Sequence, residues 1–271
     1  MQIKNDNVLH EYHDVISAEV FFSENDWEST KTSSYEKLLK PRFMASHIDW
    51  SDITQIKEAK YPFLKIVYSN SSIVSIEASS GAVREAPIFY TFKNNKILIS
   101  DHPNKLVANN VLLDELSLNE FLSFGYVTSD RTLLDGVHSL EAGNHLIFGK
   151  DGTFITKDYW YNCSSVLNTD YEDCLESLQR ETESTFDDLF QTIKGKSVLL
   201  PLSAGYDSRF IASMLKIGGH EDVTCFAWGK PGNQDIEVSR KIAHKLGYRW
   251  ESVDYSENNW RAVFESEWIE P

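Results

Sequence analysis

Residues 202–209 read Leu-Ser-Ala-Gly-Tyr-Asp-Ser-Arg, and this stretch decides how the second half of the chain is interpreted. The apolar run of residues 196–202 precedes it, and apolar residues spaced by three and four follow it to residue 215. A short apolar run bounded by turn residues is typical of a buried strand in a parallel sheet, and the spacing that follows indicates a helix. The stretch therefore lies at a strand-to-helix turn, at the edge of the sheet where such folds bind ligands.

The residue types in this turn suit a phosphate group. Small residues let the backbone approach an anion closely, and the N–H groups that begin a helix point at it with the positive end of the helix dipole. The hydroxyl groups of Ser203 and Ser208 can add hydrogen bonds, and Asp207 is a natural ligand for a Mg²⁺ ion that bridges to phosphates. The alternative for Ser203, Gly205, Asp207 and Ser208 is an ordinary helix start, because Ser and Asp cap helices in many proteins.

The pattern around the turn predicts alternating helices and strands. One apolar face with spacings of three and four predicts a helix over residues 171–193, followed by Gly195 as a stop signal. Strands are expected at residues 223–228 and 248–253, with a helix at residues 234–246 between them. Strand–helix–strand alternation predicts a doubly wound parallel α/β domain, assigned to residues 171–271.

The first 160 residues have a different pattern, which is β-rich with little helix. A helix is expected at residues 117–124, with Ser117 as its cap and Glu120 completing a capping box. Asn94-Asn95 and Asp151-Gly152 are hairpin signals. Residues 161–170 are polar and aperiodic, and we interpret them as a linker. The clearest expected strands are residues 63–68, 73–76, 88–92, 97–99, 145–148 and 153–156.

Composition excludes several classes of protein. The chain has 271 residues, of which 41% are hydrophobic, so it can bury a core and has room for two domains. It carries 26 basic and 41 acidic residues, and both halves are acidic, so the average field repels nucleic acid. No apolar run is long enough for a membrane span, and the first residues contain no signal segment. Three cysteines, Cys163, Cys174 and Cys225, then indicate reduced thiols in a cytoplasmic protein.

Residues 203–208 resemble the SGGxDS signature of the PP-loop ATP pyrophosphatases, and their surroundings narrow the resemblance to asparagine synthase-like proteins. Residues 226–229 and the segment with Asp235 and Glu237 are similar to that family's second strand and helix, and in the family the second strand lies beside adenine and ribose. Residues 86–90 and 121–143 and the pair Tyr159-Trp160 are similar to the end of the family's N-terminal domain. The resemblance spans about residues 80–260.

The resemblance implies a fold and a site. Residues 1–160 would form a degenerate, glutaminase-like sandwich of the Ntn-hydrolase type. Residues 171–271 would form a partial PP-loop synthetase domain of the adenine nucleotide alpha hydrolase type, incomplete at its C-terminus. Mg²⁺ would lie on Asp207, and no catalytic residue is assigned. The residues placed around ATP are Ser203, Ala204, Gly205, Tyr206, Asp207, Ser208, Phe226, Ala227, Trp228 and Gly229.

The chain departs from the family pattern at three points. Position 2 is Gln2, where the family's glutaminase domain has its catalytic cysteine, and the family's glutamine-binding motifs are missing. Position 204 is Ala where the family usually has Gly, and a positive φ there would cost about 1–2 kcal/mol. The sequence stops at Pro271, whereas family members continue into a helical region that supplies the acyl-substrate pocket, so the chain is either a fragment or a short natural relative.

Residues next to the turn have weaker signals. Arg209 can reach a phosphate or lie on a solvated helix face, and the two interpretations are equally supported. Tyr206 can pack over the site or against a neighbouring helix, and we favour packing against the helix. Asp235 and Glu237 are expected in a solvated first helical turn, which favours acids, rather than beside ribose or metal.

Other candidate residues are interpreted as structural. Histidines His10 and His13 are spaced by three but have no carboxylate or cysteine partner at metal-ligand spacing, so we expect surface or core histidines. An aromatic set is expected to pack in the core: Trp27, Trp50, Tyr159 and Trp160.

The sequence therefore predicts an ATP-dependent, amide-forming ligase. By resemblance, it would activate a small carboxylate as an acyl-adenylate with release of pyrophosphate, and ammonia or another amine would capture the acyl group. Neither nucleic acid nor a membrane is an expected partner, and the oligomeric state is open. The alternative is a non-catalytic nucleotide-binding or interaction remnant of such a synthetase. A tRNA-modifying PP-loop enzyme is disfavoured by the acidic charge of both halves.

The cysteine positions predict that this chain does not hydrolyse glutamine. Residues 1–162 contain no cysteine, so no thiolate is available there as a nucleophile. Purified protein incubated with glutamine should release no glutamate above background. Glutamate release that a thiol-alkylating reagent abolishes would contradict this prediction.

Overall fold

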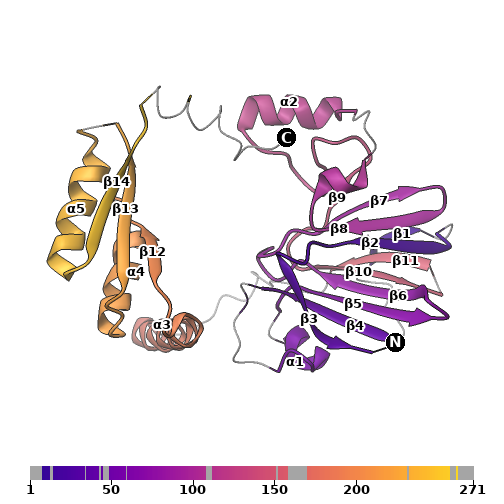
Figure 1. Ribbon diagram of the computed structural model, residues 1–271, viewed down its shortest axis with the longest axis horizontal. Coiled ribbons are helices and arrows are strands. Elements are labelled where there is room, and N and C mark those ends of the chain that lie inside the picture. Colours follow the sequence, from indigo (N-terminus) through magenta and orange to yellow (C-terminus); the bar gives the residue numbers. More distant parts are fainter. Residues whose placement is uncertain are drawn as a thin grey trace. The chain divides into compact units, whose positions relative to one another are not determined.

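The structure is a computed structural model with two compact units, unit 1 (Met1–Asn168) and unit 2 (Thr169–Pro271) (Figure 1). Both sheets and helices are present, so the chain is mixed α/β. The residues that the structure describes are 8–12, 15–33, 35–42, 44, 49–58, 60–107, 112–150, 152–157, 170–230, 232–256 and 261.

Unit 1 consists mainly of two β-sheets (Figure 1). Within its described residues, one sheet has the order β1-β11-β10-β6-β5-β4-β3 and the other the order β2-β8-β7-β9. Helical segments are α1 (Ile53–Glu58), η2 (Pro103–Leu106) and α2 (Glu115–Phe124). The strands are β1 (Val8–Tyr12), β2 (Ser17–Phe21), β3 (Trp27–Thr32), β4 (Glu36–Pro41), β5 (Phe63–Ser69), β6 (Ser72–Ser79), β7 (Phe89–Lys93), β8 (Lys96–Ser100), β9 (His138–Ser139), β10 (Asn144–Gly149) and β11 (Gly152–Lys157).

The two sheets of unit 1 share one hydrophobic core. Successive side chains of a strand point to opposite faces, so alternate residues can be buried together. Leu64 and Ile66 of β5 and Ile76 of β6 pack in one cluster with Ile97 and Ile99 of β8, which belongs to the other sheet. Unit 1 is therefore a two-sheet sandwich.

Two of the four aromatic residues that were expected to pack in the core lie in the described part of the chain. Trp27 belongs to the core between the sheets, and Trp50 packs with Ile56 of α1 in a smaller cluster, so both are buried as expected. Tyr159 and Trp160 lie outside the described residues, as does His13, and the side chain of His10 is not described.

Strands are confirmed at all six expected positions in unit 1, and the Asn94-Asn95 turn is confirmed by positive φ values of 51° and 58°. The expected cap of the helix near residue 117 is wrong. Helix α2 begins at Glu115, and the Asp114 carboxylate accepts the N–H of Ser117 at 2.7 Å. Hydrogen bonds from Ser117 also lower the pKa of Asp114. Asp114 is therefore the cap, and Ser117 lies inside the helix. Ser117 is also buried.

Unit 2 alternates helices with parallel strands, as the sequence predicts. The strand order is β12-β13-β14, and both neighbouring pairs are parallel. Helix α5 ends at Gly247, whose φ of 77° suits a glycine C-cap. The elements are α3 (Tyr171–Ile193), β12 (Val198–Pro201), α4 (Tyr206–Ile217), β13 (Val223–Gly229), α5 (Gln234–Leu246) and β14 (Arg249–Asp254).

Helices α4 and α5 pack against the same face of this sheet. Ala212 of α4, Ala243 of α5 and Cys225 of β13 belong to one buried cluster with Leu200 of β12. Leu199, the neighbour of Leu200, is 72% exposed because it lies on the opposite face. The expectation of a buried strand at residues 196–202 therefore holds for one face only in the described part of unit 2, the face that these two helices cover.

Helix α3 has the expected bounds, but only part of its apolar face is covered. Phe186 is buried and contacts Phe210 of α4, with ring centroids 5.6 Å apart. Leu175 and Leu178, one and two turns into the helix, are 46% and 64% exposed. No helix in the described residues is long and apolar enough to cross a membrane.

A close contact at Gly218 joins the end of α4 to α3 and gives a testable prediction. Gly218 has a φ of −71°, which any residue can adopt, but a Cβ there would lie 2.5 Å from Cζ of Phe190. Gly218→Ala should therefore lower the free energy of unfolding by about 1–3 kcal/mol through overpacking. Urea denaturation measures this cost. In a Phe190→Ala background the cost should fall, and an equal cost in both backgrounds would contradict the explanation.

Candidate functional site

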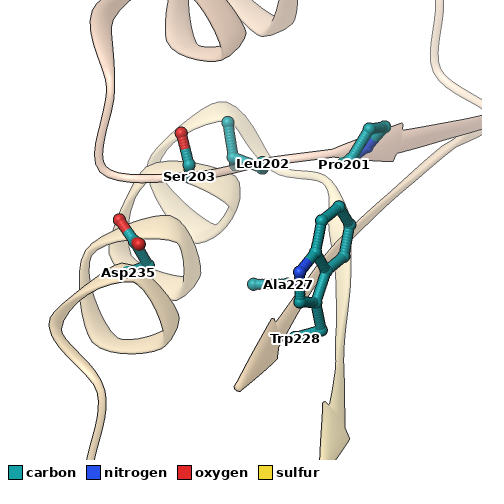
Figure 2. A pocket seen from close by; sticks show the side chains of 6 residues that line it. All are labelled: Pro201, Leu202, Ser203, Ala227, Trp228 and Asp235. Carbon is teal, nitrogen blue, oxygen red and sulfur yellow. The ribbon is translucent and has the colours of Figure 1, made fainter. Parts of the chain in front are cut away.

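The ends of β12 and β13 lie side by side and form one wall of a cavity (Figure 2). Pro201 pairs with Phe226, and the N–H of Leu202 donates to the carbonyl of Phe226 at 2.8 Å, so the pairing continues past β12. Figure 2 shows the Ser203 hydroxyl and the Asp235 carboxylate on one side and the Trp228 indole on the other. The cavity has a volume of about 260 Å³ and is lined by Pro201, Leu202, Ser203, Ala227, Trp228 and Asp235.

Hydroxyl groups fix the turn that follows β12. Ser203 Oγ lies 3.0 Å from Ser208 Oγ and accepts the N–H of Gly205 at 3.1 Å. Ser208 Oγ accepts the N–H of Ser203 at 3.1 Å. A Cβ at Gly205 would lie 3.1 Å from Ser203 Oγ, so a small residue suits this position. The two serines thus hold the turn in one conformation before any ligand is bound.

The first turn of α4 is open to an anion. Gly205 is its N-cap and has no side chain to accept the N–H groups of the first turn. Those N–H groups carry the positive end of the helix dipole. Asp207 is exposed in the same turn. Tyr206 is 83% exposed, so the expectation that it packs against a neighbouring helix is wrong. Instead, the Arg209 guanidinium lies over its ring, 4.9 Å from the centroid.

Ala204 is held on both sides of its backbone. Its N–H donates to Asp235 Oδ1 at 2.9 Å, and its carbonyl accepts from Arg209 Nη2 at 2.6 Å. Ala204 is not among the residues with positive φ, so alanine here carries no left-handed strain. Asp235 is exposed in the first turn of α5, as expected, and its carboxylate also binds the turn that follows β12. Glu237, by contrast, pairs with Arg240 at 2.8 Å.

The strand side of the cavity is aromatic. The rings of Phe226 and Trp228 have centroids 5.7 Å apart, and Trp228 is 47% exposed. Gly229 follows at a φ of 151°, and a Cβ there would lie 3.0 Å from Nδ2 of Asn233. Asn233 caps α5 by accepting the N–H of Asp235 at 2.8 Å. A glycine is thus required where β13 turns toward the helix that carries Asp235.

The described residues contain no group of three or more His, Cys, Asp or Glu side chains that could hold a metal ion by themselves. The carboxylate of Asp207 is the oxygen ligand that the first turn of α4 offers. Mg²⁺ in proteins commonly keeps several waters and binds one or two carboxylates together with phosphate oxygens. This donor set therefore fits a Mg²⁺ ion that is held largely by a bound phosphate compound.

The structure brings the two predicted segments of the site together, since residues of both the turn and β13 line the same cavity. The sequence interpretation did not include Pro201, Leu202 or Asp235 among the site residues. Asp235 could be recognised from the sequence as an acidic residue in the first turn of a helix. Its contact with Ala204 could not, because that contact requires the pairing of β12 with β13. Cys163 lies outside the described residues.

Comparison with known proteins gives a distant relationship. No protein-family model matches the chain. The chain is 25% identical over 167 residues to the glutamine-hydrolyzing asparagine synthetase 1 of Bacillus subtilis (strain 168), covering 59% of this chain and 26% of that protein. It thus spans about a quarter of that relative's length. This match over part of the chain supports an adenine nucleotide alpha hydrolase-like relationship.

Among solved structures, the NH3-dependent NAD synthetase from Campylobacter jejuni, in complex with the nitrate ion, is similar at 21% identity and a TM-score of 0.28. The similarity covers 34% of this chain and 42% of that chain.

The two described cysteines should differ sharply in reactivity. Cys225 on β13 is fully buried, and burial raises the pKa of its thiol to about 11. Cys174 on α3 is exposed. Because the thiolate is the reactive form, iodoacetamide at pH 8 should label Cys174 and leave Cys225 unlabelled in the folded protein. Peptide mass spectrometry reads the sites, and a urea-unfolded sample, in which both react, is the control. Equal labelling in the folded protein would contradict the burial of Cys225.

Proposed function

We propose that unit 2 binds ATP and serves an ATP-dependent ligase that activates a small carboxylate as an acyl-adenylate and releases pyrophosphate. Ammonia or another amine then forms the amide. The observation that carries this proposal is the cavity that combines the turn after β12 with the aromatic end of β13. The sequence similarity to asparagine synthetase supports the same class of reaction.

The phosphate groups belong at the start of α4. The uncapped first turn offers N–H groups to an anion, and Ser203 and Ser208 place hydroxyl groups beside it. Such fixed donors stabilise negative charge that develops on a leaving group, and they need no reorganisation when the bond breaks. Gly205 allows the backbone to come close to the phosphates.

The nucleoside belongs at the end of β13. Trp228 and Phe226 offer aromatic surface, and the small side chain of Ala227 lines the cavity beside Trp228. The cavity volume of about 260 Å³ is slightly below the usual range of small-molecule pockets, so the cavity would hold the nucleoside alone, with the phosphates outside it at the start of α4. In this arrangement the purine lies on one side of Ser203 and the phosphates lie on the other.

Asp207 would hold the Mg²⁺ ion that accompanies ATP. When bound, Mg²⁺ supplies positive charge that offsets the charge of the phosphate oxygens. Asp207 is exposed at the first turn of α4, within the part of the helix that would face the phosphates. A carboxylate alone would repel phosphate there, so its position is favourable only with a cation between them.

The proposed reaction has two bond exchanges. An oxygen of the substrate carboxylate attacks the α-phosphorus of ATP, the bond from this phosphorus to the bridging oxygen breaks, and pyrophosphate leaves with the electron pair. The amine nitrogen then attacks the acyl carbon, AMP leaves, and the nitrogen loses a proton. We propose that unit 1 is a degenerate glutaminase-like sandwich that does not supply the nitrogen, since residues 1–162 contain no cysteine.

Nucleotide binding is the first test of this proposal. MgATP at about 100 times its Kd should raise the free energy of unfolding by about 2.7 kcal/mol, seen as a higher melting temperature. Asp207→Asn should remove the part of this shift that depends on Mg²⁺. Asp173→Asn is the matched control, because Asp173 is also an acidic residue in the first turn of a helix, α3.

The ligase chemistry is tested by exchange of labelled pyrophosphate into ATP with a panel of small carboxylates, acidic amino acids first. Exchange that depends on one carboxylate identifies the acyl substrate. A wild-type protein that shows no shift of melting temperature at millimolar MgATP would contradict the proposal.

A further inference from the structure

The backbone of Ala204 is held by two charged side chains of opposite sign. Asp235, from the first turn of α5, accepts the Ala204 N–H at 2.9 Å. Arg209, from α4, donates to the Ala204 carbonyl at 2.6 Å. Each peptide group is planar, so these two contacts orient the peptide planes on both sides of the Ala204 Cα atom. Rotation about φ and ψ of this residue is therefore restricted from both directions.

Fold stability alone gives no reason for this arrangement. Arg209 Nε is buried and has no hydrogen-bond partner among the described residues, and a buried unpaired donor is unfavourable. Asp235 is exposed on the rim of the cavity, where a second carboxylate repels an anionic ligand. A buried donor without a partner needs an explanation other than packing.

We propose that Asp235 and Arg209 are positioning residues that hold the turn at Ala204 in the conformation that binds the phosphates. This inference rests on the proposed function, which assigns the start of α4 to the phosphate groups. Asp235 acts as a hydrogen-bond acceptor, and its charge is not needed. Arg209 acts as a donor to the carbonyl. Together they tie the turn to the starts of both α4 and α5.

The role of Asp235 is tested by three variants and one probe, magnesium pyrophosphate. Asp235→Ala removes the acceptor and should weaken pyrophosphate binding about tenfold, the loss expected for one hydrogen bond to a charged group. Asp235→Asn keeps an acceptor oxygen and removes the charge, so its affinity should equal or exceed that of the wild type. Glu237→Ala removes an acidic residue from the same turn, which pairs with Arg240, and should leave the affinity unchanged.

Two further measurements separate positioning from general destabilisation. Isothermal titration with adenosine should give the same affinity in Arg209→Met as in the wild type, because Arg209 does not line the cavity proposed for the nucleoside. Arg209→Met removes the donor and the buried unpaired Nε, so it should weaken pyrophosphate binding while the melting temperature stays the same or rises. A structural role alone would change affinity and melting temperature in the same direction.

Hydrogen exchange at the Ala204 amide tests the arrangement without any ligand. By NMR, this amide should be protected in the wild type and in Asp235→Asn and should exchange faster in Asp235→Ala. If the wild type binds no pyrophosphate or MgATP, the proposed function fails, and amide exchange still decides whether Asp235 holds the turn. Unchanged exchange in Asp235→Ala, or equal loss of pyrophosphate affinity in Asp235→Ala and Asp235→Asn, would overturn the inference.

Discussion

The parallel pairing of β12 with β13 is the interaction on which the candidate site depends. The hydrogen bond from the N–H of Leu202 to the carbonyl of Phe226 carries this pairing beyond the last residue of β12. The chain then turns at Ser203 directly beside Ala227 and Trp228, which are distant in sequence. A shift of this register by one residue would reverse the faces of all side chains on β12. The cavity, the turn and the contact between Asp235 and Ala204 would then all be lost.

Burial in unit 2 fixes that register. Leu200 and Cys225 are register partners, and both point into the cluster under α4 and α5. Small residues at the contacts, Ala212 and Ala243, are fully buried, so the helices can approach the strands closely. Apolar packing on one face of the sheet thus determines which polar side chains lie at the ends of the strands, where the candidate site is.

The sequence alone predicted much of this arrangement, because its signals were local. Periodicity located α3 and α5 to the residue, and the strand-to-helix turn was expected at residues 203–207, although α4 already begins at Tyr206. Predictions were wrong where two residues compete for the same hydrogen bond, or where the outcome depends on residues distant in sequence. Ser117 was expected to cap α2, but Asp114 is the cap and accepts the N–H of Ser117. Tyr206 was expected to be packed, but its side chain on α4 is exposed. Pattern alone also could not show which faces of the sheet are covered, since Leu199 and Leu200 are equally apolar and differ only in what packs against them.

The contacts of Ala204 explain why a residue other than glycine is acceptable in this turn. Glycine is favoured in phosphate-binding turns because it reaches positive φ and lets the backbone approach the ligand. Ala204 does not have positive φ. The hydrogen bonds from its backbone to Asp235 and Arg209 restrict its conformation. Alanine has fewer conformations than glycine to lose on folding, so the substitution favours the ordered turn. Gly205, which follows, keeps the small size that Ser203 Oγ requires. Two requirements that a glycine often meets in such turns thus fall on two residues. Position 204 needs a fixed backbone conformation, and position 205 needs a small residue that lets the backbone come close to a ligand.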